Sequence, residues 1–314
     1  MTSTSTAIRR VTPSTPPRRW GRRSASGKRL GYVLVSPAVL VLLAITGFPL
    51  VYNIWNSFHY FNLLNPSSHR FVGLQNYQQV FSNQTGLGPA IEHTIGYTAV
   101  SVPIEVGLGL GIALLLNRPI RGRGVARSLL LLPWAVPTVI SATVWKTMLD
   151  PQTGGVDYVL SLLHLPGAHT TWLNTSSLLS WVAILFADTW QVVPFAAIIL
   201  LAGLQGIPRE LYEAATVDGA GAWRTFWRIT LPLLRPALLV VLVFRTLSAL
   251  MIFDIIYALT GAGPGTSTST LAYVDWNSFL VNGNFGLGGA ISVVMVVIAL
   301  IVAAAYRLIL RPKA

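Results

Sequence analysis

The chain has 314 residues, of which 53% are hydrophobic and only 10% are charged, and its formal net charge is +12. Soluble domains carry about a quarter charged residues, so this composition excludes an ordinary soluble protein and indicates a membrane protein. Cysteine is absent, which excludes disulfides, thiolate nucleophiles and iron–sulfur sites.

Residues 1–29 are rich in Ser, Thr, Pro and Arg and cannot bury a core, so they are predicted to form a disordered basic tail. The tail is too long and too polar for a standard signal peptide, and the apolar run after it is expected to remain as a membrane anchor. Within the tail, Gly21–Lys28 fails as a phosphate-binding loop, because Gly27 comes one residue late and Arg29 replaces the required hydroxyl residue. The chain is therefore not predicted to bind ATP itself.

Six apolar runs in residues 30–314 are long enough to cross a bilayer, whose core about 30 Å thick needs about 20 apolar residues per helix. Helices are predicted rather than a barrel, because barrel strands would show short alternating segments. The fold class is therefore an all-α polytopic membrane protein with six transmembrane helices. The predicted spans are residues 31–55, 93–116, 127–148, 179–202, 237–259 and 286–307.

Lysine and arginine are distributed very unevenly between the loops of this arrangement. Nineteen of them precede the first span, lie in the second or fourth loop, or follow the last span, whereas the other three loops hold only Arg70. Positive loops remain cytoplasmic, so both termini are predicted to be cytoplasmic. The excess charge then faces anionic membrane lipid. The alternative, a basic tail that binds nucleic acid, lacks interleaved aromatic residues and a folded scaffold, so no nucleic-acid partner is predicted.

The loop between the fourth and fifth spans contains an ordered segment at residues 210–236. A short helix is predicted to begin with Glu213–Ala215 and to end at Asp218 and Gly219, because Gly enters the left-handed conformation that stops helices. Pro236 then falls near the first turn of the fifth span, where its missing N–H costs nothing. Without a partner, the segment would be an interfacial amphipathic helix between two spans.

Eleven residues of this segment carry a resemblance to a known family: Glu213, Ala214, Ala215, Asp218, Gly219, Ala220, Phe226, Ile229, Leu231, Pro232 and Pro236. With these residue types at this spacing, the segment resembles the EAA segment of binding-protein-dependent ABC importer permeases. In that family the segment is a coupling helix that docks into a cleft on a separate ATPase. The resemblance implies the same role here, and the ATPase-coupling residues are then Glu213, Ala214, Ala215, Asp218, Gly219, Ala220, Leu231 and Pro232.

Three further segments are similar to sugar-importer permeases of the trehalose/maltose type. They are Phe71–Tyr77 (F-V-G-L-Q-N-Y), Arg245–Gly263 followed by Pro264, and Phe285–Ser292. The resemblance implies a bacterial cell-membrane protein that pairs with a second permease subunit, an ABC ATPase dimer and an extracytoplasmic solute-binding protein. It implies a di- or oligosaccharide substrate. No cofactor is implied for this chain, since the partner subunits use the ATP.

The predicted spans contain the charged residues Glu105, Asp188, Arg245 and Asp254. A charge at the bilayer centre costs roughly 2.5–3.5 kcal/mol, so such residues face protein or water. Arg245 and Asp254 are nine positions apart, about two and a half turns, and are not expected to pair with each other. Each of the four either lines a substrate path or is a structural ion-pair partner inside the bundle.

The predicted substrate path combines Trp190, Gln191, Arg245, Ser248 and Asp254, because a sugar needs an aromatic face and hydrogen-bonding groups. Trp190 could instead serve packing or interfacial anchoring. The family's sugar-contacting residues form no motif that can be carried onto this sequence. The five histidines show no paired metal spacing, and no catalytic set can be placed in one pocket, so neither a metal site nor an enzymatic activity is predicted.

Two other classes of protein remain open at this point. A secondary transporter or channel driven by an ion gradient would use the intramembrane acids as a relay, but it predicts an internal repeat that the sequence does not show. It would also leave residues 210–236 unexplained. A membrane scaffold protein would show no substrate-dependent phenotype.

Overall fold

The computed structural model describes residues 25–82, 87–119, 121–167 and 169–309. Most of the predicted basic tail, residues 1–24, lies outside the described residues. The chain divides into two units, residues 1–51 and residues 52–314.

The described residues of the first unit belong to one apolar helical run, which continues past Val51 to Ser57. Helix α1 (Ala25–Leu42) continues through a π-helical turn (Leu43–Gly47) into α2 (Phe48–Ser57). The π-helical turn lies just before Pro49, whose nitrogen cannot donate to the preceding turn. Residues Tyr32–Ser57 are long and apolar enough to span a membrane, in agreement with the predicted first span. Because α1 begins at Ala25, the predicted disordered tail is wrong over its last five residues.

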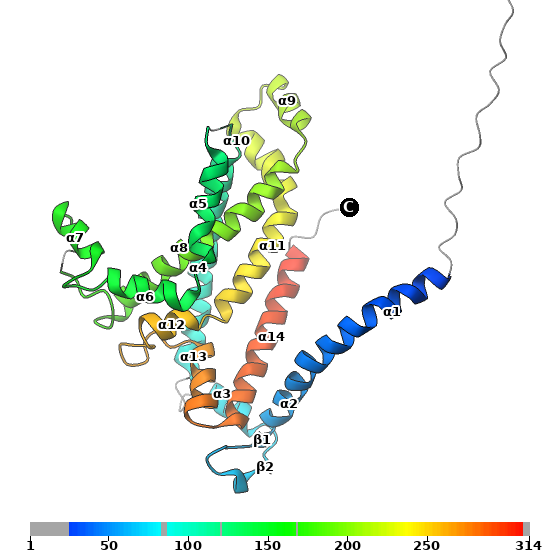
Figure 1. Ribbon diagram of the computed structural model, residues 1–314, viewed down its shortest axis with the longest axis vertical. Helices are drawn as coiled ribbons and strands as arrows, with labels where there is room; N and C mark the ends of the chain where they lie inside the picture. Colours follow the sequence, from blue (N-terminus) through cyan, green and yellow to red (C-terminus); the bar gives the residue numbers. More distant parts are fainter. Residues whose placement is uncertain (1–24, 83–86, 120, 168, 310–314) are drawn as a thin grey trace, which may run out of the picture. The chain divides into compact units, whose positions relative to one another are not determined.

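The second unit is a helical bundle whose long helices supply the remaining spans (Figure 1). Four of these runs are unbroken candidate spans, and with Tyr32–Ser57 they make five among the described residues, or six when one broken span is counted. The elements that form these spans are α4 (Leu87–Leu116), α5 (Arg123–Ala135), α6 (Thr138–Met148), α8 (Ser177–Gln205), α10 (Ala222–Thr225), a π-helical turn η4 (Phe226–Thr230), α11 (Leu231–Leu250) and α14 (Phe285–Ile309). Of these, α10, η4 and α11 join into one span.

Two of the predicted spans differ from the structure. The third predicted span is not straight, because α5 and α6 meet at a bend of 93°. The fifth span runs from Ala222 to Leu250, earlier than the predicted 237–259. The apolar residues after Leu250 are buried by packing inside the protein instead; Ile255 and Ile256 are 1% and 0% exposed. Hydrophobicity alone cannot distinguish such buried segments from a continuous span.

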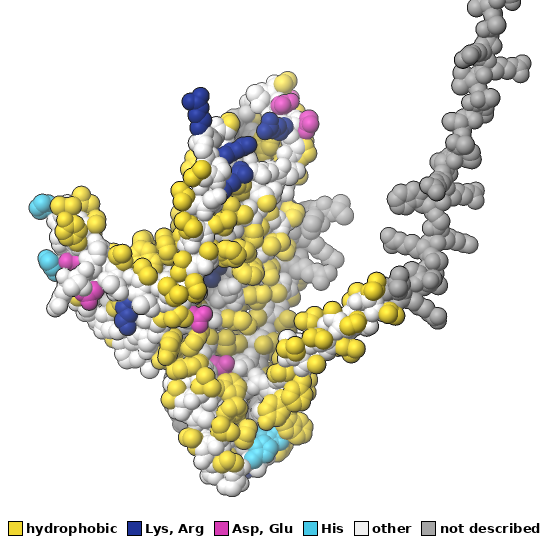
Figure 2. All heavy atoms as spheres, in the orientation of Figure 1, with side chains coloured by type: hydrophobic (Ala, Val, Ile, Leu, Met, Phe, Trp, Pro, Cys, Tyr) yellow, Lys and Arg dark blue, Asp and Glu magenta, His cyan; other side chains and the backbone are white. Residues whose placement is uncertain are grey.

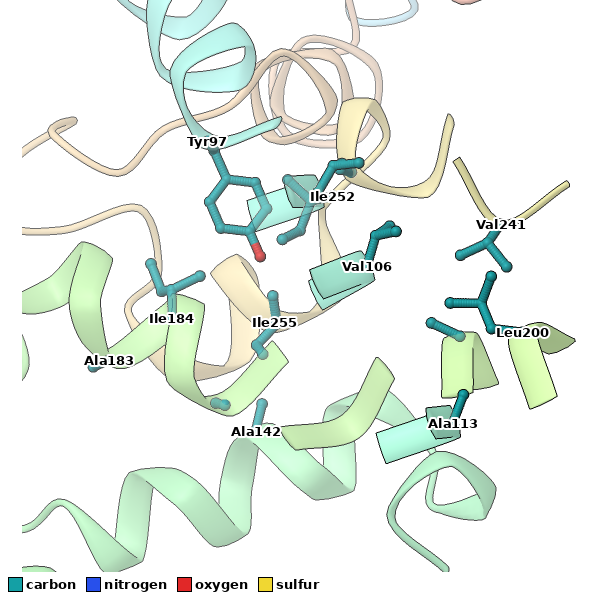
Figure 3. Close-up of a cluster of buried hydrophobic side chains, with 14 of the residues drawn as sticks. Tyr97, Val106, Ala113, Ala142, Ala183, Ile184, Leu200, Val241, Ile252 and Ile255 are labelled. Carbon is teal, nitrogen blue, oxygen red and sulfur yellow. The ribbon is translucent and has the colours of Figure 1, made fainter. Parts of the chain in front are cut away.

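Helices α4, α8 and α11 pack side by side at the centre of the bundle (Figure 1). Small residues bring their backbones close together. A Cβ atom added to Gly109 of α4 would lie 2.8 Å from Ala196 Cβ of α8, and one added to Gly203 of α8 would lie 2.6 Å from Ala237 Cβ of α11. Such contacts are typical of helix packing inside membranes. The apolar core around them draws on α4, α6, α8, α11 and the segment after α11 (Figure 3).

Short elements connect the long helices of the bundle. They are β1 (His59–Tyr60), the 3-10 turn Pro66–Ser68, β2 (Arg70–Phe71), α3 (Gln75–Phe81), α7 (Gly155–Leu162), α12 (Asp254–Leu259), α13 (Leu271–Trp276) and the π-helical turn Asn277–Val281. Strands β1 and β2 are antiparallel. The F-V-G-L-Q-N-Y segment turns at Gly73, whose φ of +58° favours glycine, and places Asn76 inside the protein. There the Asn76 amide donates to the backbone oxygens of Ser57 and His59.

Arginine side chains gather at the end of the bundle formed by α5, α9 (Arg209–Val217) and α10 (Figure 2). This is the end where the second and fourth predicted loops lie. The arginines of these two predicted loops therefore lie together at one end of the folded bundle.

Candidate functional site

The first part of the predicted coupling segment folds into the short helix α9, which ends where the sequence predicts. Three backbone hydrogen bonds close its end: Asp218 N–H to Ala214 O, Gly219 N–H to Thr216 O, and Ala220 N–H to Ala215 O (2.8 Å). The last two bonds, together with a φ of +70° at Gly219, form a Schellman motif. The predicted start is wrong, because α9 begins at Arg209 and Glu213–Ala215 lie in its middle. The pyrrolidine ring of Pro208 fixes its φ at −57°, which suits a helix start at Arg209, about one turn before the predicted start at Glu213.

One face of α9 is free and another is anchored to the bundle. Glu213 and Ala214 are exposed, whereas Ala215 is buried. The hydroxyls of Tyr212 and Thr230 lie 3.2 Å apart and join α9 to the start of the fifth span. The small exposed residues let another surface approach the backbone closely, and the Glu213 carboxylate can accept hydrogen bonds from a partner cation.

Leu231 and Pro232 lie inside a continuous helix rather than at its entrance, since α10, η4 and α11 form one candidate span. Pro236, predicted near the first turn of this span, therefore lies well inside it. The π-helical turn η4 directly precedes Leu231 and Pro232. Proline removes a backbone donor in a helix interior, and a local π-turn is one way in which a helix accommodates the missing bond.

Three intramembrane charges meet in one buried cluster. Arg245 of α11 pairs through Nε and Nη2 with both carboxylate oxygens of Glu105 from α4, and through Nη2 with Asp188 from α8. The Nη2–Oε1 distance is 2.9 Å. The Tyr97 hydroxyl donates to the same Asp188 oxygen. Glu105 is 0% exposed and Arg245 is 4% exposed. The structural reading of these charges as ion-pair partners is therefore confirmed for three of the four, and Arg245 does not pair with Asp254.

The break between α5 and α6 is held by a side chain from α8. Pro133 and Pro137 flank the break, and the backbone between them is extended at Val136. The Gln191 amide nitrogen donates to Val136 O (2.8 Å) and to Thr138 Oγ1 (3.3 Å). A break within an apolar region leaves backbone groups that need partners, and Gln191 supplies one. The Oε1 atom of Gln191 is buried and has no hydrogen-bond partner among the described residues.

A cavity of about 490 Å³ opens beside this break. Four of the five predicted substrate-path residues line it: Gln191, Arg245, Ser248 and Asp254. Ser248 and Asp254 are exposed, and Asp254 begins α12 instead of lying within the fifth span. An arrangement of apolar walls with a few convergent polar groups is typical of small-molecule sites.

Trp190 does not line this cavity. It packs at 5.7 Å, ring centroid to ring centroid, against Trp145 in a T-shaped arrangement on another face of α8. The aromatic wall comes instead from Trp134, Phe195 and Phe244, whose rings form a chain with centroid separations of 5.5 and 4.7 Å. The packing interpretation of Trp190 matches its position.

Several residues of this site were not among the predicted site residues. Tyr97, Glu105 and Asp188 complete the charge cluster, although both acids stand out in the sequence as charges inside spans. Pro133 and Pro137, four residues apart, were the available signal for the broken span, since proline interrupts helices.

Residues 105–312 match the family described as binding-protein-dependent transport system inner membrane component. The trehalose/maltose transport system permease protein MalF of Thermococcus litoralis is 42% identical over 272 residues, which cover 87% of this chain and 90% of MalF. The trehalose transport system permease protein SugA of Mycobacterium tuberculosis is 38% identical over 277 residues, or 88% of this chain and 87% of SugA. The sulfoquinovosyl glycerol transport system permease protein SmoG of Agrobacterium fabrum is 40% identical over 299 residues, or 94% and 95% of the two chains.

Solved structures bear on the fold alone, because their sequence identities are low. A bacterial ABC transporter involved in the import of the acidic polysaccharide alginate aligns with a TM-score of 0.78 and 23% identity, covering 92% of this chain and 97% of that chain. The MetNI methionine ABC transporter in an inward-facing conformation aligns with a TM-score of 0.52 and 16% identity over 73% of this chain and 98% of that chain.

Proposed function

This chain belongs to the binding-protein-dependent transport system inner membrane components, and from that premise we propose that it conducts a carbohydrate, a di- or oligosaccharide, across the bacterial inner membrane. It is a multi-pass permease, not an enzyme, which agrees with the sequence-based expectation. The family membership also favours an ATP-driven importer over a secondary transporter or channel.

The carbohydrate assignment is supported by the cavity at the α5–α6 break. Its aromatic wall of Trp134, Phe195 and Phe244 faces polar groups at Gln191 and Ser248. Sugars present apolar ring faces and peripheral hydroxyls, so they need both kinds of contact. The relatives MalF and SugA carry trehalose or maltose in their names, which points in the same direction.

The buried charge cluster gives the cavity a fixed polar wall. Because Glu105 and Asp188 engage Nε and Nη2 of Arg245, the guanidinium is held in one orientation at the edge of the cavity. A preoriented donor binds a sugar hydroxyl without the entropy cost of ordering a long side chain. Gln191 Oε1, which has no hydrogen-bond partner in the described part of the chain, offers the complementary acceptor.

The exposed face of α9 is the proposed contact with the ATPase. Its coupling residues are Glu213, Ala214, Ala215, Asp218, Gly219 and Ala220, with Leu231 and Pro232 in the adjoining helix. The arginine-rich end of the bundle, which carries α9, is proposed to face the cytoplasm together with both termini. A second permease subunit and an ABC ATPase dimer complete the proposed complex, and an extracytoplasmic solute-binding protein delivers the sugar at the opposite end.

Uptake of radiolabelled trehalose and maltose by proteoliposomes containing the complete importer tests this proposal. We expect uptake to require ATP on the side of the ATPase and to survive ionophores that collapse proton and sodium gradients. Uptake driven by an ion gradient without ATP would overturn the importer assignment, and ATP-driven uptake of non-carbohydrate solutes only would overturn the substrate assignment.

A matched pair of variants tests the cavity. Ser248→Leu fills the cavity without removing a tertiary hydrogen bond, because within the described ranges the Ser248 hydroxyl donates only to Phe244 O on its own helix. We expect at least a tenfold loss of uptake at an unchanged amount of assembled complex. Val240→Leu is the control, since Val240 is exposed on the same helix and does not line this cavity. Equal uptake by both variants would show that the sugar passes elsewhere.

A further inference from the structure

A second cavity lies at the arginine-rich end of the bundle, directly beside the coupling helix. Its volume is about 690 Å³, and it is lined by the end of α4, the helix α9 and the first two turns of the fifth span. The polar groups that line it are Arg118, Tyr212, Thr216, Thr225 and Thr230. This cavity is separate from the proposed sugar path, with which it shares no lining residue.

The charge of this cavity is positive. Arg118 is exposed, and none of the ion pairs formed among the described residues involves it. Among the residues that the structure describes, no Asp or Glu side chain lines the cavity. The acids of α9, such as Glu213, are not part of its wall. An isolated guanidinium in a concave site favours an anion, and it matches phosphate oxygens in particular.

Hydroxyl groups add donors around the guanidinium. Tyr212 and Thr230 make one hydrogen bond between their two hydroxyls, which uses one O–H and leaves the other free to donate. Thr216 donates to Tyr212 O and keeps its oxygen lone pairs. The cavity thus presents a charged fork together with neutral donors, a combination suited to a phosphate ester with a polar substituent.

The position of the cavity favours a membrane lipid as the source of this phosphate. Trp223 forms part of the wall and is 75% exposed, and it contacts Trp227 edge-on at 5.5 Å. Exposed tryptophans at the end of a transmembrane helix are typical of the headgroup layer. Basic pockets between transmembrane helices on the cytoplasmic side are suited to anionic lipid headgroups.

We propose that this cavity binds the headgroup of an anionic phospholipid, with Arg118 pairing with its phosphate. The proposal rests on the cytoplasmic orientation included in the proposed function. Because Tyr212 and Thr216 of α9 form one wall, the bound headgroup contacts the coupling helix from the side of the bundle. Anionic lipid then acts as a structural ligand of the coupling region, and the importer senses the composition of the inner leaflet.

Lipid binding to the purified, assembled importer tests the proposal by native mass spectrometry. Phosphatidylglycerol is compared with phosphatidylcholine of the same acyl chains, and sn-glycerol 3-phosphate serves as the soluble probe. Loss of one arginine contact at about 1 kcal/mol predicts roughly fivefold weaker phosphatidylglycerol binding for Arg118→Gln. Arg235→Gln is the matched control, since Arg235 is exposed on α11 and does not line the cavity. We expect its phosphatidylglycerol binding to equal that of the wild type.

A second readout is independent of assembly yield. Brominated phosphatidylglycerol quenches tryptophan fluorescence at short range, so the difference in quenching between the wild type and Trp223→Phe reports occupancy of this cavity. We expect this difference to disappear in Arg118→Gln and to be absent with brominated phosphatidylcholine. If the soluble probe binds as strongly as the lipid, the site is a phosphate site and not a lipid site, which overturns the proposal.

Equal phosphatidylglycerol binding by the wild type and Arg118→Gln would also overturn it. If Arg118→Gln instead releases the ATPase without any change in lipid binding, the cavity holds an ATPase side chain, and the lipid proposal is wrong. ATP-driven sugar uptake in phosphatidylcholine vesicles is measured in parallel. Normal uptake there, combined with no lipid effect, would refute the lipid site and leave the proposed function intact.

Discussion

Removal of Arg245 is expected to destabilise the bundle strongly. Its guanidinium makes three charge-assisted hydrogen bonds to Glu105 and Asp188, and all three residues are at most 5% exposed. Each such bond contributes roughly 1.5–3 kcal/mol, but the desolvation of the charges offsets much of the sum. Arg245→Met leaves two buried carboxylates without a counterion, a situation that typically costs about 3–5 kcal/mol. We therefore expect the free energy of unfolding, measured in mixed detergent micelles, to fall by this amount.

Two further variants distinguish lost charge pairing from lost packing. Arg245→Lys keeps one positive charge but cannot engage Glu105 through a planar fork, so an intermediate loss is expected. The triple variant Glu105→Gln, Asp188→Asn, Arg245→Met removes all the charges together and is expected to recover at least half of the stability lost in Arg245→Met. If Arg245→Met alone unfolds like the wild type, or if the triple variant is less stable than Arg245→Met, the cluster does not stabilise the bundle through charge pairing.

Three other outcomes can be measured directly. The variants Glu213→Lys and Gly219→Val are expected to insert normally into the membrane but to lose the ATPase in co-purification. At Gly219, a β-branched residue in the left-handed region adds about 1–2 kcal/mol of strain. Normal co-purification of the ATPase with both variants would exclude the α9 contact. Burial raises the pKa of Asp275 to about 7 from its ordinary value of 3.8. The carboxyl group therefore stays protonated to a higher pH in the folded state than in the unfolded state, and the stability of the fold decreases as the pH rises from 3.8 to about 7. The variant Asp275→Asn can still accept the hydrogen bond from the Ser292 hydroxyl. It is expected to melt at a higher temperature than the wild type at pH 8 and at the same temperature at pH 3.5. An equal melting temperature at pH 8 would contradict the effect of burial. Reporter fusions test the topology, and one reversed loop would break the six-span arrangement: an outside signal is expected at residues 75, 165 and 270, and an inside signal at residues 122, 220 and 312.

The features that the sequence predicted well depend on local chemistry. The end of α9 is an example, since the left-handed preference of Gly219 acts within one turn and needs no distant partner. The family resemblance of the same segment is confirmed by the match over residues 105–312. The predicted roles of individual residues in α9 remain predictions.

The features that were missed depend on contacts between distant parts of the chain. The cost of a buried Arg245 could be stated from the sequence, but its partners lie 140 and 57 positions away. The bend between α5 and α6 was hidden by the apolar composition of residues 127–148. It is stabilised by Gln191, which lies more than 50 positions away from the groups that it binds. The hydrophobic pattern and the helix propensity of a segment carry no information on which distant residue it will contact.

The close contacts at Gly109 and Gly203 have a mechanical consequence. Where one backbone lies directly against the next helix, no long side chain can change rotamer to absorb a displacement. Helices α4, α8 and α11 are therefore stiff toward one another, and Arg245 fastens the same three helices further along. Because a hydrogen bond between Tyr212 and Thr230 joins α9 to the fifth span, we expect a displacement of α9 to move these three helices together. The bend between α5 and α6, by contrast, is held by two hydrogen bonds from the single amide of Gln191, so we expect it to deform more easily than the packing of these three helices.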